Sequence, residues 1–115
     1  SKFGVARTAA YTTTKHAILG LTRVLAAELV AHGVTANTIL PGFVDTEMVQ
    51  EQVAKAAAAR DTPPEEILKS FLRIQPIGRM VTTAEVGALV AYLCSDAAEP
   101  ITGQSLHVDG GAYQS

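Results

Sequence analysis

Tyr11 and Lys15 are the pair of residues in this sequence whose types and spacing could do chemistry together. Residues four apart on a helix project from the same face, so a phenol and an ammonium group would be neighbours. A phenol alone is a poor proton donor at neutral pH, and a nearby positive charge favours its ionised form. The pair therefore suits general acid–base catalysis, and Lys15 keeps donors for the sugar hydroxyls of a cofactor. The competing interpretation of Tyr-x-x-x-Lys is a solvated helix pair that contributes roughly 0.2–0.5 kcal/mol.

A long amphipathic helix over residues 11–32 is predicted to position this pair. Apolar residues recur three and four apart, and Gly33 follows where helices often end in the left-handed conformation. The predicted buried stripe consists of Ala17, Ile18, Leu21, Val24, Leu25 and Leu29. Because the opposite face carries little charge, we also expect burial on a second side, against a partner subunit.

Downstream, the pattern predicts strands over residues 34–40 and 104–108 and helices over residues 48–60, from residue 64 onward, and 83–94. Thr82 or Thr83 should cap the last helix, whose expected buried stripe is Val86, Leu89, Val90, Leu93 and Cys94. A strand–helix–strand crossover of this length indicates a parallel α/β sheet. Two strands cannot cover this many amphipathic helices, so we expect the missing strands upstream, and expect the chain to be incomplete on its own.

Composition excludes several classes of function. A net charge of −2 over 115 residues gives no basic face for a nucleic acid. The apolar run over residues 86–94 falls short of the roughly 20 residues that cross a bilayer, so no membrane partner is expected. A single cysteine, Cys94, and no visible secretory signal favour a cytoplasmic location. His32 and His107 have no metal-ligand spacing with it, so no metal site is predicted.

Six ordered segments resemble the short-chain dehydrogenase/reductase family. They are residues 10–17, 34–37, 41–46, 76–79, 91–96, and 101–104 together with 108–111. The resemblance covers essentially the whole chain. It implies an α/β fold in which residues 1–115 form the C-terminal half of one doubly wound, parallel-sheet, Rossmann-like domain that binds NAD or NADP, with NADP favoured.

The resemblance also implies roles for individual residues. Tyr11 would protonate the carbonyl oxygen as hydride arrives, and Lys15 would hold the nicotinamide ribose and make the tyrosine more acidic. The matching strand-to-helix loop would bind the nicotinamide end of the cofactor through its backbone amides and a threonine hydroxyl. Its cofactor-binding residues would be Pro41, Gly42, Val44 and Thr46.

The sequence departs from the family in its first half. It has no glycine-rich phosphate turn, and the family's catalytic serine would precede residue 1. Ser1 is too close to Tyr11 for that role and is interpreted as a loop residue. We therefore expect the 115-residue polypeptide alone to be inactive and poorly soluble.

Residues 47–75 are the expected substrate lid, because loops after strands carry specificity. The lid and the lead-in at residues 2–5 resemble ketoreductases, which implies a 3-oxoacyl (β-ketoacyl) thioester substrate. The alternative is an enzyme similar to 3-hydroxybutyrate dehydrogenase, in which Gln52 would hold a carboxylate. A third hypothesis is a non-catalytic, dimerising remnant. The family resemblance implies a homodimer or homotetramer.

Overall fold

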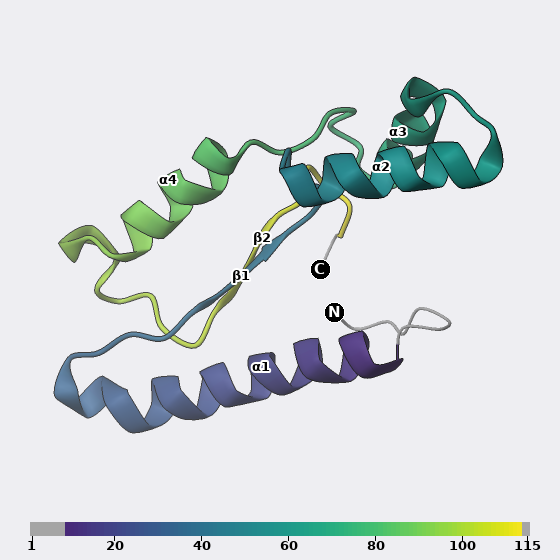
Figure 1. The fold of residues 1–115 in the computed structure, drawn as a ribbon. Helices are drawn as coiled ribbons and strands as arrows, with labels where there is room; N and C mark the ends of the chain where they lie inside the picture. Colours follow the sequence, from purple (N-terminus) through teal and green to yellow (C-terminus); the bar gives the residue numbers. More distant parts are fainter. Residues whose placement is uncertain (1–8, 114–115) are drawn as a thin grey trace. The chain divides into compact units, whose positions relative to one another are not determined.

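The computed structural model describes residues 9–113. The residues expected to form the opening loop, Ser1 included, and the lead-in at residues 2–5 lie outside this range. The elements in chain order are α1 (Ala9–Leu29), the 3-10 helix η1 (Val30–His32), β1 (Thr38–Pro41), α2 (Glu47–Arg60), α3 (Pro64–Leu72), α4 (Thr83–Leu93), the 3-10 helix η2 (Asp96–Ala98) and β2 (Ser105–Val108) (Figure 1). They divide into two compact units, whose described residues are 9–39 with 93–106 and 40–92 with 107–113.

Strands β1 and β2 pair in a two-stranded sheet and lie side by side in Figure 1. The Thr38 amide donates to the Gln104 carbonyl (2.8 Å), and the Gly42 amide donates to the Val108 carbonyl (3.0 Å). Both partners advance in the same direction along the chain, so the strands are parallel, which confirms the predicted crossover. The backbone pairing extends from residue 38 to residue 42, and Pro41 is the last residue of β1.

The predicted strand over residues 34–40 is wrong in its first half, since β1 begins only at Thr38. Over residues 34–37, side chains form the hydrogen bonds that backbone groups would form in a paired strand. Asn37 donates through Nδ2 to the Ile101 carbonyl (2.9 Å) and accepts through Oδ1 from the Gln104 amide (3.1 Å). The Ala36 amide donates to Thr102 Oγ1 (3.1 Å). β-Branched composition suggested a strand, but an asparagine able to bond backbone on both sides favours an irregular loop.

Helix α1 is as long as predicted and ends through η1 at Gly33, which has the expected left-handed conformation (φ 70°). The predicted buried stripe is wrong. Among the described residues of α1, Ala26 is the buried one. Its Cβ lies close to Gly103, and a Cβ added to Gly103 would be 3.4 Å from it. The expected stripe stays largely open, with exposed fractions of 41% at Ile18 and 58% at Leu21. A glycine opposite Ala26 permits close approach there, and periodicity alone could not indicate that.

Helices α2 and α3 pack against each other and are joined by a short connection (Figure 1). Thr46 caps α2 by accepting a hydrogen bond from the Val49 amide (3.3 Å), and α3 starts with Pro64 in its first turn. The buried cluster between them consists of Val53, Ala57 and Ile67. This core gives the predicted lid its own hydrophobic support.

Helix α4 starts with a capping box, which confirms Thr82 as the cap. The Glu85 amide donates to Thr82 Oγ1 (3.1 Å), and the Thr82 amide donates to Glu85 Oε2 (2.9 Å). Arg79 binds the same carboxylate, with Nη2 2.7 Å from Oε1. Its hydrogen bond, with that of the Thr82 amide, lowers the pKa of Glu85 to about 2. Arg79 in the matched segment 76–79 thus clamps the start of this helix.

The predicted buried stripe of α4 is wrong, because no residue of this helix is buried and Cys94, just beyond it, is exposed. Val86, Leu89 and Leu93 are partly covered and point to the expected side, whereas Val90 is 44% exposed. A sheet of two strands within residues 9–113 is too narrow to cover the helix. The periodicity identified the apolar side correctly and overestimated its burial.

Candidate functional site

Tyr11 and Lys15 lie next to each other in the first turns of α1. The ammonium nitrogen of Lys15 stands over the tyrosine ring, 5.3 Å from its centroid, which is within the range of a cation–π contact. The tyrosine side chain is 67% exposed, so its hydroxyl is accessible. The spacing therefore brings the two groups together as predicted, while their catalytic roles stay a prediction.

The pair occupies a definite face of α1. Tyr11, Lys15, Leu19 and Ala26 follow one another at spacings of four, four and seven, so they form one stripe along the helix. Leu19 is partly covered and Ala26 is 5% exposed beside the Gly103 loop. Tyr11 and Lys15 therefore lie on the same side of α1 as Ala26, the residue that packs within this unit. They form the polar end of a stripe that is otherwise apolar.

The second group of predicted residues, Pro41, Gly42, Val44 and Thr46, forms one turn between β1 and α2 in the other unit. The Phe43 amide donates to Gln75 Oε1 (2.8 Å). Val44 pairs with Val81 in a parallel bridge, in which the Asp45 amide donates to the Val81 carbonyl (2.8 Å). This turn is therefore held by hydrogen bonds on one edge.

Three donors of the turn remain available. The amides of Val44 and Thr46 donate to no acceptor among residues 9–113, and the Thr46 hydroxyl oxygen accepts from Val49 while its hydrogen stays free. Neighbouring residues of an extended segment direct their N–H groups to opposite edges, so both free amides share the edge away from Val81. A carboxamide or phosphate oxygen is the kind of group that such donors bind.

Gln75 is a site residue that the sequence analysis missed. It is the most buried polar side chain among those described, at 1% exposed. Its Nε2 donates to the Arg79 carbonyl (2.7 Å) and lies 3.4 Å from the Phe43 carbonyl oxygen, while Oε1 takes the Phe43 amide. The available signal was a polar residue between an apolar helix and Pro76, but only the fold shows which backbone groups it bonds.

Gly42 is required because the turn is crowded. A Cβ at this position would collide with Gln75 Oε1 and would stand 2.9 Å from the Cα of Asp109. Asp109 is buried and accepts hydrogen bonds from the amides of Gly111 (3.1 Å) and Tyr113 (3.0 Å). The aspartate thus fixes the turn that follows β2, and this turn lies against Gly42.

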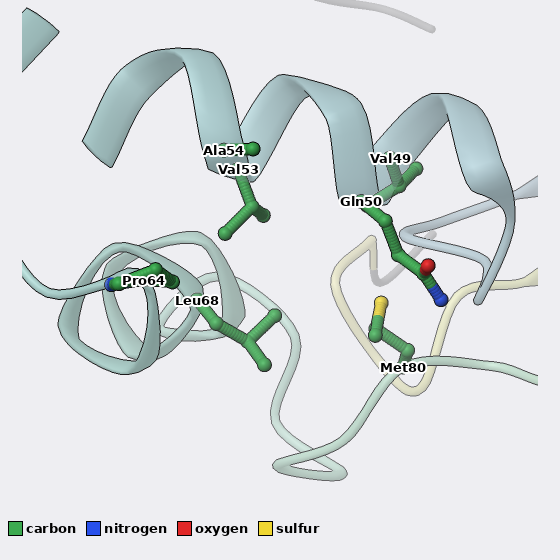
Figure 2. Close-up of a pocket in the computed structure, with 7 residues that line it drawn as sticks. All are labelled: Val49, Gln50, Val53, Ala54, Pro64, Leu68 and Met80. Atoms are coloured by element: carbon green, nitrogen blue, oxygen red, sulfur yellow. The ribbon is translucent and has the colours of Figure 1, made fainter. Parts of the chain in front are cut away.

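The predicted lid contains an apolar hollow of about 220 Å³ (Figure 2). Its lining residues come from α2, α3 and the segment before α4, and are Val49, Gln50, Val53, Ala54, Pro64, Leu68 and Met80. The one polar member, Gln50, donates through Nε2 to Asp45 Oδ1 (2.9 Å). Gln52, the sequence candidate, is exposed on α2 and does not line this hollow.

Residues 9–113 contain no group of three or more His, Cys, Asp or Glu side chains that could hold a metal ion. Within the same range, no helix has both the length and the apolar character needed to cross a membrane.

Comparison with known proteins places these features in a family. A family model described as enoyl-(acyl carrier protein) reductase matches residues 1–113. A protein from Streptomyces virginiae, assigned as a ketoacyl reductase of the monensin polyketide synthase, is 44% identical over 110 residues, which are 96% of this chain and 42% of that protein. The D-beta-hydroxybutyrate dehydrogenase of Cupriavidus necator is 43% identical over 107 residues, 92% of this chain and 42% of that enzyme.

A solved structure supports the same assignment. A point variant of the actinorhodin polyketide ketoreductase with NADPH superposes with a TM-score of 0.86 at 36% identity, covering 96% of this chain and 42% of that one. This likeness and the parallel strand pair confirm the predicted α/β, Rossmann-like fold class. The chain spans about two fifths of the length of the relatives it matches. From its residue order, its fold and these matches, the chain belongs to the short-chain dehydrogenase/reductase family.

Proposed function

We propose that this chain carries the proton-transfer pair and part of the nicotinamide site of a 3-oxoacyl (β-ketoacyl) thioester reductase. The observation that carries the proposal is the Lys15 ammonium, 5.3 Å from the centroid of the accessible Tyr11 ring. NADP or NAD, when bound, supplies or accepts the hydride. NADP is favoured, in line with the ketoreductase neighbour that was solved with NADPH.

Tyr11 is the proposed general acid. Its hydroxyl donates a proton to the substrate carbonyl oxygen during reduction and takes it back during oxidation. The Lys15 charge stabilises the resulting phenolate, and its remaining N–H donors can bind ribose hydroxyls of the cofactor. Both side chains lie on one helix face, so a single rigid element sets their separation.

The turn of Pro41, Gly42, Val44 and Thr46 is the proposed contact for the nicotinamide end of the cofactor. Its free donors are the Val44 amide, the Thr46 amide and the Thr46 hydroxyl, while the other edge of the turn is bonded internally. Donors that are fixed before binding lose little conformational freedom when a ligand arrives. The residues present therefore fit a carboxamide and a phosphate oxygen.

The lid over residues 47–75 favours a thioester with an apolar chain over a free acid. The hollow has six apolar lining residues, and a free carboxylate there would lose its hydration without gaining donors. Its volume is below the roughly 300–1,000 Å³ of typical ligand pockets, which suits a short acyl chain. The 3-hydroxybutyrate alternative has one supporting observation, the D-beta-hydroxybutyrate dehydrogenase relative.

A substrate comparison tests the proposal. The full-length protein is supplied with NADPH or NADH and either an acetoacetyl thioester or free acetoacetate, and nicotinamide absorbance is followed. We expect the thioester to give the higher kcat/KM. A higher kcat/KM for free acetoacetate would establish the dehydrogenase alternative. Reduction of an enoyl thioester, without reduction of the 3-oxoacyl thioester, would show that the enzyme reduces the carbon–carbon double bond. If the protein binds neither cofactor, the hypothesis of a non-catalytic remnant is the one that remains.

The lid assignment has its own test. Ala54→Phe should fill the hollow and lower kcat/KM for a 3-oxohexanoyl thioester about 10-fold or more relative to acetoacetyl thioester, since one misfitted methylene group changes discrimination by roughly 1–3 kcal/mol. Ala58→Phe is the matched control, because Ala58 is exposed on the same helix outside the hollow. Equal effects of the two variants would exclude the hollow as the chain site.

A homodimer or homotetramer is also proposed. The apolar residues Ile18, Leu21, Val24 and Leu25 of α1 are all more than a third exposed, which a stable surface rarely tolerates as a continuous stripe. Burial against a second copy would cover them. Elution of the full-length protein at monomer mass in size-exclusion chromatography would contradict this.

A further inference from the structure

We infer that Gln75 is a positioning residue that aims the Val44 amide at the bound cofactor. The inference rests on the proposed function, because it concerns the same turn. Gln75 directly precedes the matched segment 76–79, and its side chain reaches the turn from the end of the predicted lid.

The geometry of one peptide group carries the argument. The Phe43 carbonyl and the Val44 N–H belong to the same planar, trans peptide unit, so they point in opposite directions. Whatever holds the carbonyl oxygen of Phe43 therefore sets the direction of the Val44 N–H. That oxygen accepts a hydrogen bond from the Val81 amide (2.8 Å) and also lies 3.4 Å from Gln75 Nε2.

Gln75 holds the preceding peptide group as well. Its Oε1 accepts from the Phe43 amide at 2.8 Å, so one side chain contacts both the amide and the carbonyl of Phe43. The third bond, from Nε2 to the Arg79 carbonyl at 2.7 Å, anchors the side chain to the segment that leads to Val81. The side-chain amide of Gln75 thus bonds the backbone of Phe43 in the way that a residue of a neighbouring strand would.

Burial makes this arrangement rigid. Gln75 is 1% exposed, and water cannot easily replace its bonds. Loss of the side chain would leave the Phe43 amide without its acceptor and the Phe43 carbonyl held by Val81 alone. The Val81 bond by itself would hold the peptide unit between Phe43 and Val44 less tightly, and the direction of the free Val44 N–H would vary more.

The test separates aiming of the donor from general damage. In the full-length protein, dissociation constants are measured for NADPH and for 2′-phospho-ADP-ribose, which keeps the phosphates and lacks the nicotinamide ring. For Gln75→Leu we expect the NADPH dissociation constant to rise about tenfold, the usual worth of one hydrogen bond to a ligand. The constant for the fragment should change less than about threefold, since Val44 is proposed to contact only the nicotinamide end.

Two further variants keep the result interpretable. Ile67→Ala disturbs the core between α2 and α3 and serves as the control for lost stability, measured by thermal unfolding of each variant. Gln75→Glu keeps the chain length and the Oε1 acceptor and lacks the Nε2 donor. Its second carboxyl oxygen would face the Arg79 and Phe43 carbonyl oxygens, so it should weaken NADPH binding at least as much as Gln75→Leu, and it replaces the leucine variant if that one does not fold.

Each outcome has a distinct meaning. Equal weakening of NADPH and of the fragment, or no weakening beyond that of Ile67→Ala, would overturn the role of Gln75 while leaving the proposed function intact. Absence of NADPH and NADH binding by the unmodified protein would overturn the proposed function itself.

Discussion

Gly42→Ala should destabilise the protein because the added methyl group would clash with neighbouring atoms. Glycine is required here by this crowding and not by its backbone conformation. The added Cβ would overlap Gln75 Oε1 and would stand 2.9 Å and 3.0 Å from the Cα and Cβ of Asp109. Asp109 is held by two backbone hydrogen bonds and cannot retreat easily. Gln75 must therefore move to relieve the first contact, and the contact with the Asp109 backbone adds a separate cost.

The expected magnitude follows from those contacts. Overpacking of a close-packed region costs about 1–3 kcal/mol. Displacing Gln75 leaves the partly buried Phe43 amide without its acceptor, which costs about 1–3 kcal/mol more. The free energy of unfolding should thus fall by about 2–6 kcal/mol, a large part of the 5–15 kcal/mol typical of a domain.

A double-mutant cycle in urea tests the reasoning, with unfolding of the full-length protein followed by circular dichroism. Gln75→Ala removes the oxygen that the new methyl group meets, so Gly42→Ala should cost about 1–2 kcal/mol less in that background. Variants that add within about 0.5 kcal/mol would show that Gln75 and Gly42 do not oppose each other. An unchanged stability of Gly42→Ala would refute the whole account of the turn.

The remaining predictions concern the proton donor and the start of α4. Tyr11→Phe should lower kcat by about 10²–10⁴-fold with little change in NADPH affinity, and a loss below tenfold would exclude Tyr11 as the acid. Lys15→Met should weaken both turnover and cofactor binding, measured by the same assays. The Arg79 and Thr82 hydrogen bonds lower the pKa of Glu85 from 4.5 to about 2, so their stabilisation is complete above pH 4.5 and lost as the pH falls toward 2. An NMR titration of Glu85 with a midpoint near 4.5 would contradict that pairing.

The order of elements and the two candidate groups could be predicted from local sequence. Four-residue spacing places Tyr11 beside Lys15 on any helix, and Gly33 and Thr82 mark helix ends through interactions with their immediate neighbours. The parallel strand pair followed from the length of the crossover. Each of these features depends on residues close together in the chain.

Burial and the contacts of the turn were decided by tertiary structure. Periodicity shows that α1 and α4 have apolar sides, but which side is covered depends on what lies opposite, such as Gly103 beside Ala26. Phe43 and Gln75 are 32 positions apart in the sequence, so no local pattern could reveal their hydrogen bond. A hydrogen bond forms only between groups that are close in space. The sequence therefore identified the residues of this turn, and only the fold showed which of their N–H groups remain free.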